Sequence, residues 1–217
     1  MKGSMNLQAA WLDMRNLSPV QAAALGSLWH FEHVNKLWHH TRHWTRVVEY
    51  PVVLTERPFE ITDDILDVGA GETPLVPYLA QYCHSATGID LMLPSEGFIK
   101  KIQRSFPNVR YDIGDITKLP YTDESFDRVF CVSTLEHVMP LAGVTKGLQE
   151  LVRVAKKTVF ITFDMHIGDW SILDAIEQGL GARIDMLRTP PTSTGIVQND
   201  TIPIGVGCII IDKREDI

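Results

Sequence analysis

The chain has 217 residues, of which 45% are hydrophobic, and its formal net charge is −7. A chain of this length buries enough surface to form a real core, and its acidic balance argues against nucleic acid as a main partner, because phosphate binding needs a basic face. The sequence shows no charged leader and no run of about 18 apolar residues. We therefore expect no membrane span and a cytoplasmic location, where the widely spaced Cys83, Cys131 and Cys208 would be reduced thiols.

The first part of the chain, residues 5–57, is expected to be mostly helical. Ser18-Pro19 is a helix start signal, and apolar residues recur with a helical period between residues 29 and 50. Pro51 is predicted to end that helix, because the residue before a proline disfavours the helical region. These signals divide the chain into an N-terminal helical cap, residues 1–57, and a core, residues 58–217.

Histidines and tryptophans are frequent in this cap. His39 and His43 are four residues apart and share a helix face, a spacing that can bind a metal. No glutamate or cysteine completes a known signature, so we predict no metal site. A polar face is favoured, with a role for one histidine in lining the active-site pocket as the alternative. Trp29, Trp38 and Trp44 are interpreted as packing residues.

The core opens with an apolar run that ends in Asp67 and continues into the turn Gly69-Ala70-Gly71. A buried parallel strand that leads through a glycine turn into a helix is how α/β proteins hold nucleotide-like ligands. Glycine lets the backbone approach the ligand, because no Cβ intervenes. Thr73 is a candidate N-cap for the following helix, with Pro74 as its first residue.

The residues around this turn narrow the choice of ligand. A dinucleotide fingerprint would have a third glycine at position 74, where Pro74 stands and offers no N–H to a pyrophosphate. No Gly-Lys-Ser/Thr follows, so a P-loop is excluded. Asp67 suits a cationic, zwitterionic ligand without a phosphate, such as S-adenosylmethionine (SAM).

Two further apolar runs also end in acids. The run 86–90 ends in Asp90, and the run 109–115 ends in Gly114-Asp115. A carboxylate after the second strand can accept both ribose hydroxyls of a bound nucleotide. Asp90 alone does not separate NAD from SAM.

At this point the sequence resembles the class I SAM-dependent methyltransferases of the small-molecule type. The matching segments are D-V-G-A-G (67–71), G-I-D (88–90), G-D-I-x-x-L-P (114–120), S-F-D-x-V (125–129), S-T-L-E-H-V (133–138) and E-L-x-R-V (150–154). The resemblance covers residues 65–163 and departs from the family at Thr73, where a third glycine is usual. It implies an α/β, Rossmann-like fold with a seven-stranded, mostly parallel sheet, an antiparallel last strand at 204–212, and flanking helices. The sixth strand is poorly visible in the sequence.

The resemblance also assigns residues to the cofactor. It places Asp67, Gly69, Ala70 and Gly71 at the methionine end, Asp90 and Leu91 at the ribose, and Asp115, Ile116 and Ser133 around adenine. His137 would face the methyl acceptor, where it is a candidate general base or, alternatively, a helix cap. Cys131 lies within an apolar strand and is interpreted as a buried thiol.

The implied activity is transfer of a methyl group from SAM to a small-molecule acceptor, with S-adenosylhomocysteine (SAH) as product. The acceptor atom, oxygen, nitrogen or carbon, stays open. Two other classes remain: a non-catalytic SAM-binding or scaffold subunit, and a nicotinamide dehydrogenase, against which Pro74 and the Gly114-Asp115 segment count. We expect the N-terminal cap to lie over the carboxyl ends of the strands as a lid.

Overall fold

The computed structural model describes residues 5–12, 17–37, 45–166, 169–188, 197–199 and 202–213. Trp38, His39, His40, His43 and Trp44 lie outside these residues, so the expectations for them stay untested. The strands are β1 (Met5–Trp11), β2 (Asp64–Val68), β3 (Ser85–Asp90), β4 (Val109–Ile113), β5 (Phe126–Val132), β6 (Ala155–His166), β7 (Val197–Asn199) and β8 (Ile202–Lys213). The helices are α1 (Pro19–Val34), α2 (Arg46–Thr55), α3 (Leu75–Leu79), α4 (Glu96–Ser105), the short 3-10 helix η2 (Leu135–His137), α5 (Leu141–Val154), α6 (Ser171–Leu180) and α7 (Asp185–Arg188).

The strands form one mixed sheet in the order β1-β8-β6-β5-β2-β3-β4, and the short β7 pairs with β8 beside this path. The five strands from β2 to β6 pair in parallel. Strand β8 is antiparallel to both β6 and β1, so β1 runs in the same direction as the parallel strands. The expected seven-stranded, mostly parallel sheet with an antiparallel last strand is confirmed.

The strand at the β8 edge comes from an unexpected part of the chain. A late hairpin exists, but β7 has only three residues. The long partner of β8 is β1, which pairs from Met5 opposite Lys213 to Trp11 opposite Gly207. The expectation that residues 5–57 are mostly helical therefore misses a strand at the start of this segment. The segment that forms β1 contains Met, Leu, Gln and two Ala, which favour helix locally, and pairing with β8 overrides that preference.

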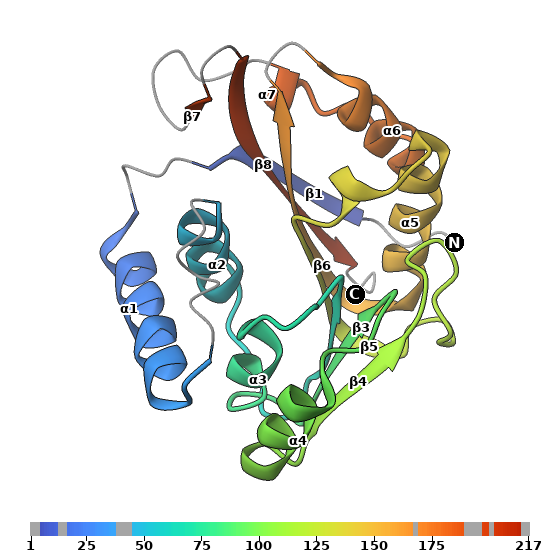
Figure 1. Ribbon diagram of the computed structural model, residues 1–217. Helices are drawn as coiled ribbons and strands as arrows, with labels where there is room; N and C mark the ends of the chain where they lie inside the picture. Colours follow the sequence, from blue (N-terminus) through green and yellow to red (C-terminus); the bar gives the residue numbers. More distant parts are fainter. Residues whose placement is uncertain are drawn as a thin grey trace.

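Helices cover both faces of the sheet (Figure 1). On one face α1, α2, α3 and α4 pack over a core that includes Leu28, Tyr50, Leu79 and Phe160. On the other face α5, α6 and α7 pack over a core that includes Leu148, Val159 and Leu173. The parallel strands are consequently buried on both sides, and their carboxyl ends form the edge that a ligand can reach.

Helix α1 begins where the sequence signal predicts, whereas α2 continues past the residue where the sequence predicts a helix end. Ser18 caps α1: its side chain accepts the Gln21 N–H, and the Gln21 side chain accepts the Ser18 N–H in return. The prediction that Pro51 ends a helix is wrong, because α2 continues through it to Thr55. Val48, Tyr50 and Val53 are each 1% exposed, and burial of this face offsets the hydrogen bond that the proline cannot donate.

Candidate functional site

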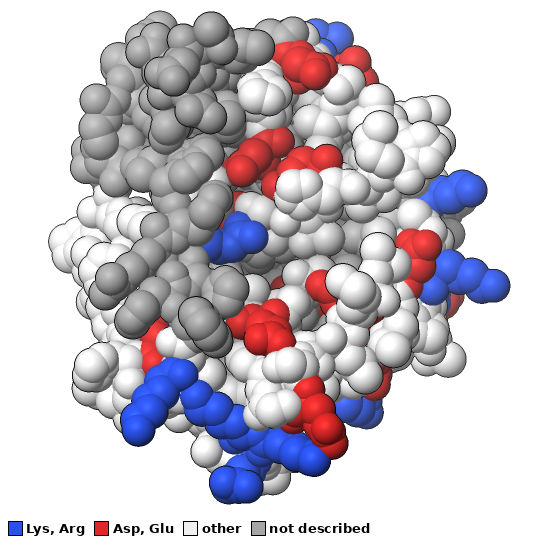
Figure 2. Space-filling view, in the orientation of Figure 1, with Lys and Arg blue, Asp and Glu red and all other residues white. Residues whose placement is uncertain are grey.

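The segments that the sequence singles out meet at the carboxyl ends of the parallel strands. A cavity of about 630 Å³ opens there between the ends of β2, β3, β4 and β5 and the start of α5. Seven of the predicted site residues line it: Gly69, Asp90, Leu91, Asp115, Ile116, Ser133 and His137. Acidic side chains also gather around a hollow near the middle of the face seen in Figure 2.

The glycine turn has the conformation that requires glycine. Gly69 has φ +79° and Gly71 has φ +49°, in the left-handed region that other residues avoid. The Gly69 N–H donates to the Ile89 carbonyl at 2.8 Å, which holds the turn against β3. A Cβ on Gly69 would lie 2.2 Å from the Thr134 hydroxyl oxygen, so no other side chain fits at this position without displacing the loop.

The predicted helix cap after the turn is wrong by one residue. Helix α3 starts at Leu75, with Pro74 before it and without a side-chain cap, and the Thr73 hydroxyl makes no capping bond. The Thr73 N–H instead closes a turn on the Ala70 carbonyl at 3.4 Å. Thr73 is therefore the last residue of a turn that starts at Ala70, and it does not cap the helix.

Asp90 joins β3 to the glycine turn. One of its carboxylate oxygens, Oδ2, accepts the Gly71 N–H at 3.0 Å. The other oxygen remains for a ligand in the cavity that Asp90 lines. Beside it, Leu91 is 69% exposed, an unusual exposure for a leucine that suits a rim covering an apolar ligand surface.

Asp67 is a buried carboxyl group at the end of β2. It is 4% exposed, and burial raises its pKa to about 7, although the positive charge of Arg46 opposes this rise. The charge of Asp90 adds to the rise. Asp67, Ala70 and Gly71 are also predicted site residues, and they adjoin the cavity-lining Gly69 in the chain without lining the cavity themselves.

Asp115 and Ile116 sit at the far end of the cavity. The Asp115 Oδ1 atom accepts the Thr117 N–H and the Thr117 hydroxyl, both at 2.8 Å. These bonds hold the pKa of Asp115 below its usual range. Ile116 is 8% exposed and contributes an apolar wall. An ionised acid beside an apolar wall suits a flat base with an exocyclic amine.

Glu49 is a site residue that the sequence reasoning missed. Its carboxyl group is fully buried and accepts the hydroxyls of Ser133 and Thr162, each at 2.6 Å. Ser133 itself has φ +44°, which is strained for a residue other than glycine. A lone glutamate inside the apolar stretch 47–54 was the available signal, since a charged residue in such a stretch needs a buried partner.

His137 is placed as expected but has an acidic neighbour of comparable interest. It lies at the end of η2, exposed at the cavity wall. Next to it, burial raises the pKa of Glu136 to about 8, and the Asp164 N–H donates to its Oε1 atom at 3.3 Å. Burial also raises the pKa of Asp164 to about 6. Glu136 and Asp164 line a second cavity of about 380 Å³, which shares His137 and Met139 with the first.

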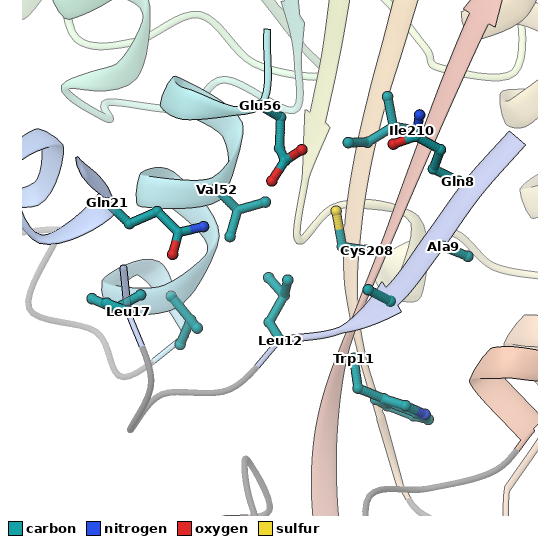
Figure 3. Close-up of a pocket in the computed structure, with 12 residues that line it drawn as sticks. Gln8, Ala9, Trp11, Leu12, Leu17, Gln21, Val52, Glu56, Cys208 and Ile210 are labelled. Atoms are coloured by element: carbon teal, nitrogen blue, oxygen red, sulfur yellow. The ribbon is translucent and has the colours of Figure 1, made fainter. Parts of the chain in front are cut away.

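A third cavity of about 370 Å³ lies elsewhere, between α2 and the sheet formed by β1 and β8. Figure 3 shows the Glu56 carboxyl group and the Cys208 thiol extending into the space beside Val52 and Leu12. Burial raises the pKa of Cys208 to about 12, so this thiol is not a nucleophile near neutral pH. None of the predicted site residues lines this cavity.

Two other expectations concern sulfur and metals. Cys131 is fully buried, as expected, and burial raises the pKa of its thiol. Among the residues that the structure describes, no group of three or more His, Cys, Asp or Glu side chains is arranged to hold a metal ion.

The comparisons with known proteins agree with this geometry. Residues 66–163 match the model of the methyltransferase domain family. Over these residues the chain is similar to methyltransferase domains. The domain contains every predicted site residue, and α1, α2 and β1 lie outside it.

Curated relatives match the methyltransferase domain over part of their length. The 2-heptyl-1-hydroxyquinolin-4(1H)-one methyltransferase of Mycobacteroides abscessus is 33% identical over 98 residues, which cover 44% of this chain and 43% of the relative. Norajmaline N-methyltransferase of Rauvolfia serpentina is 34% identical over 103 residues, which cover 45% of this chain and 34% of the relative. The chain thus spans less than half the length of these relatives.

Solved structures extend the likeness of the fold beyond the methyltransferase domain. The crystal structure of the [4+2]-cyclase SpnF covers 92% of this chain and 98% of its own, with a TM-score of 0.54 and 13% identity. That likeness shows the fold and not the reaction. Within the described residues, no helix is long and apolar enough to cross a membrane.

Proposed function

We propose that this chain binds SAM in the larger cavity and transfers its methyl group to a small-molecule acceptor, with release of SAH. The observation that carries this proposal is Asp67, a buried carboxyl group near the end of β2 and two residues before a turn with two left-handed glycines. A buried acid is costly unless a cation compensates it, and the ammonium group of the methionine moiety is such a cation. A phosphate ligand would be repelled by the same acid.

The residues around the cavity fit the rest of this cofactor. The free oxygen of Asp90 is available to a ribose hydroxyl, while its other oxygen holds the turn. Asp115 can accept the exocyclic amine of adenine, and Ile116 and Leu91 offer apolar contact to the base and the ribose edge. The glycine turn lets the backbone come close to the methionine moiety.

When bound, SAM supplies an activated methyl group on a positively charged sulfur. The main task of the chain is then to hold the acceptor in line with that methyl, since alignment alone can contribute about 7–11 kcal/mol. The second cavity, which adjoins the first at His137 and Met139, is the natural place for the acceptor. His137 is the proposed base where the acceptor must lose a proton, and Glu136 is the competing candidate.

The acceptor class follows from the size of this second cavity and from the relatives. A cavity of about 380 Å³ suits a small molecule rather than a nucleic acid base within a strand. The relatives from Mycobacteroides abscessus and Rauvolfia serpentina are named as methyltransferases of a quinolone and of norajmaline, which are both small molecules. We also propose that the helices of the segment 1–57, whose strand β1 belongs to the sheet, act as a lid on the core, residues 58–217, and that the protein works in the cytoplasm.

Calorimetry with SAM, SAH and NAD tests the cofactor assignment. We expect both SAM and SAH to bind and NAD not to bind. Binding of NAD without a response to SAM or SAH would refute the assignment. A screen of candidate acceptors with SAM, read by mass for the transferred methyl, then separates an enzyme from a SAM-binding scaffold.

A further inference from the structure

Helix α2 places a single basic side chain beside the acids of the site. The Arg46 Nη1 atom lies 2.5 Å from the Glu49 Oε2 atom, and the Arg46 guanidinium stands over the Tyr50 ring at 5.8 Å from its centroid. The Arg46 side chain is 19% exposed. A guanidinium held on one side by a carboxylate and on another by an aromatic ring has a defined direction.

The position of Arg46 is fixed through Glu49. The other oxygen of Glu49 accepts the hydroxyls of Ser133 and Thr162. Ser133 directly follows β5, and Thr162 lies in β6 opposite the last residue of β5. The helix is therefore bonded to the strand ends that border the cofactor cavity. Arg46 sits on that anchored turn, so it is positioned by the sheet rather than by α2 alone.

The charge of Arg46 acts on carboxyl groups from two strands. Burial raises the pKa of Asp67 and of Asp164, and in both the charge of Arg46 opposes that rise. Asp67 lies near the end of β2, at the proposed methionine end, and Asp164 lines the second cavity. The charge of Arg46 thus acts on one carboxyl group near the proposed cofactor site and on one in the proposed acceptor site.

We propose that Arg46 binds the carboxylate of the methionine moiety, while Asp67 binds its ammonium group. This inference rests on the proposed function. A zwitterion needs both an acid and a base, and the sequence prediction assigned only the acid. Arg46 has five N–H donors, and among the described residues its side chain donates only from Nη1, to Glu49, so the rest of the fork can bind a carboxylate. The cofactor site then extends outside the methyltransferase domain, residues 66–163.

Lys146 is the rival cation, because it lines the same cavity. The neighbours of Lys146 in α5 place it at the end of the cavity that is proposed to hold adenine. A Cβ on Gly147 would contact the Ile116 side chain at 3.2 Å, and a Cβ on Gly143 would contact Thr117 at 3.5 Å. These contacts put α5, with Lys146, against the segment proposed to hold adenine, away from the methionine end.

Two ligands that differ only in the amino acid separate these roles. SAH carries the methionine-derived amino acid, whereas 5′-methylthioadenosine has the same adenine, ribose and thioether without it. We expect Arg46→Met to weaken SAH binding about tenfold or more, as loss of a charge-assisted hydrogen bond does, and to change the affinity for 5′-methylthioadenosine less than about twofold. Arg46→Lys keeps the positive charge and loses the forked guanidinium, so it should weaken SAH binding to a smaller extent.

Calorimetry on the full chain gives these affinities, and thermal unfolding confirms that each variant is folded. If Arg46→Met does not fold, the Arg46→Lys variant carries the test with the same two ligands. Equal weakening of SAH and 5′-methylthioadenosine would show that Arg46 only supports the fold, and unchanged SAH affinity would also overturn the proposal. If Lys146→Met weakened the binding of SAH but not of 5′-methylthioadenosine, Lys146 rather than Arg46 would bind the carboxylate. Failure of the wild-type chain to bind either ligand would instead refute the proposed function itself.

Discussion

The carboxyl group of Glu49 lies 2.6 Å from the hydroxyl of Ser133, a bond between residues that are 84 positions apart in the chain. It joins α2 to the residue that follows β5, where the cofactor cavity begins. The same carboxyl group also holds Thr162 and Arg46. A single buried glutamate thereby connects the N-terminal helices to the methyltransferase domain.

Replacing this glutamate should destabilise the fold. We expect Glu49→Ala to lower the free energy of unfolding by about 3–5 kcal/mol, because it leaves Arg46 without its ionic partner and two hydroxyls without an acceptor. Urea denaturation measures the change. Glu56→Ala, at the C-cap of the same helix but with its side chain lining the third cavity, is the control and should cost less than about 1 kcal/mol. Similar losses in both variants would contradict the special role of Glu49.

Cofactor binding should depend on pH through Asp67. Its pKa in the free protein is about 7, so the carboxyl group is largely protonated below that pH and cannot pair with the ammonium of SAH. Affinity for SAH should therefore rise as pH increases from 6 to 8, with release of a proton on binding, provided that the ligand ammonium stays charged. Calorimetry in buffers of different ionisation enthalpy measures that proton. Asp67→Asn should bind weakly with a flat profile over this range, and an unchanged slope would show that another group titrates.

The same carboxyl group predicts a trend in stability without ligand. Because the folded-state pKa of Asp67 is raised above its ordinary value of 3.8, the folded state binds more protons than the unfolded state between these two values. The contribution of Asp67 to stability is thus greatest below pH 4 and is lost as pH rises to 7. Asp67→Asn should remove this loss, so the melting-temperature difference between variant and wild type should grow in favour of the variant from pH 5 to pH 8. A constant difference would argue against a raised pKa.

Asp90 has two roles that two variants can distinguish. Asp90→Ala should weaken SAM binding at least about tenfold, because charge-assisted bonds to the ribose contribute about 1.5–3 kcal/mol each. It also frees the Gly71 N–H, which Asp90 now holds at 3.0 Å. Asp90→Asn keeps an oxygen for that N–H, so it should be closer to wild type in stability while still binding SAM weakly. Wild-type affinity in a folded Asp90→Ala protein would place the ribose elsewhere.

The two glycines of the turn should respond differently to the same substitution. Gly69→Ala puts a Cβ 2.2 Å from the Thr134 hydroxyl oxygen, whereas a Cβ on Gly71 would meet nothing within 4 Å. Gly71→Ala then costs only the left-handed backbone, about 1–2 kcal/mol. Gly69→Ala should cost more than this in unfolding free energy, since the loop must also move. If denaturation gave equal losses of unfolding free energy for the two variants, Thr134 would be able to move away from the new Cβ at little cost.

The parts of the fold that local signals specify were predictable from the sequence. The three apolar runs that lead to Asp67, Asp90 and Asp115 correspond to β2, β3 and β4, and Asp115 lies two residues after β4. Such runs are typical of strands in a parallel sheet. The helix start that Ser18-Pro19 signals is likewise present, with Ser18 as the N-cap of α1. These features depend on residues within a few positions of each other.

The features that were missed depend on distant partners. Whether Pro51 ends a helix is decided by the burial of Tyr50 and Val53 against the sheet, and that burial is invisible in the local sequence. Glu49 becomes a site residue only when the fold brings Ser133 and Thr162 to it. Strand β1 exists because β8 offers an edge. Each case is tertiary structure overriding a local preference.

The pairing of β1 with β8 also determines when the sheet can be completed. Met5 pairs with Lys213, so a strand that is synthesised before β2 to β6 has its partner in a strand that is synthesised after them. The parallel strands from β2 to β6 lie between them in sequence and can assemble before β8 is made. The entropy of closing so long a loop makes this edge a late step. Until then β1 is an unpaired strand that other chains can recruit, which makes the interval before β8 appears the period of greatest aggregation risk.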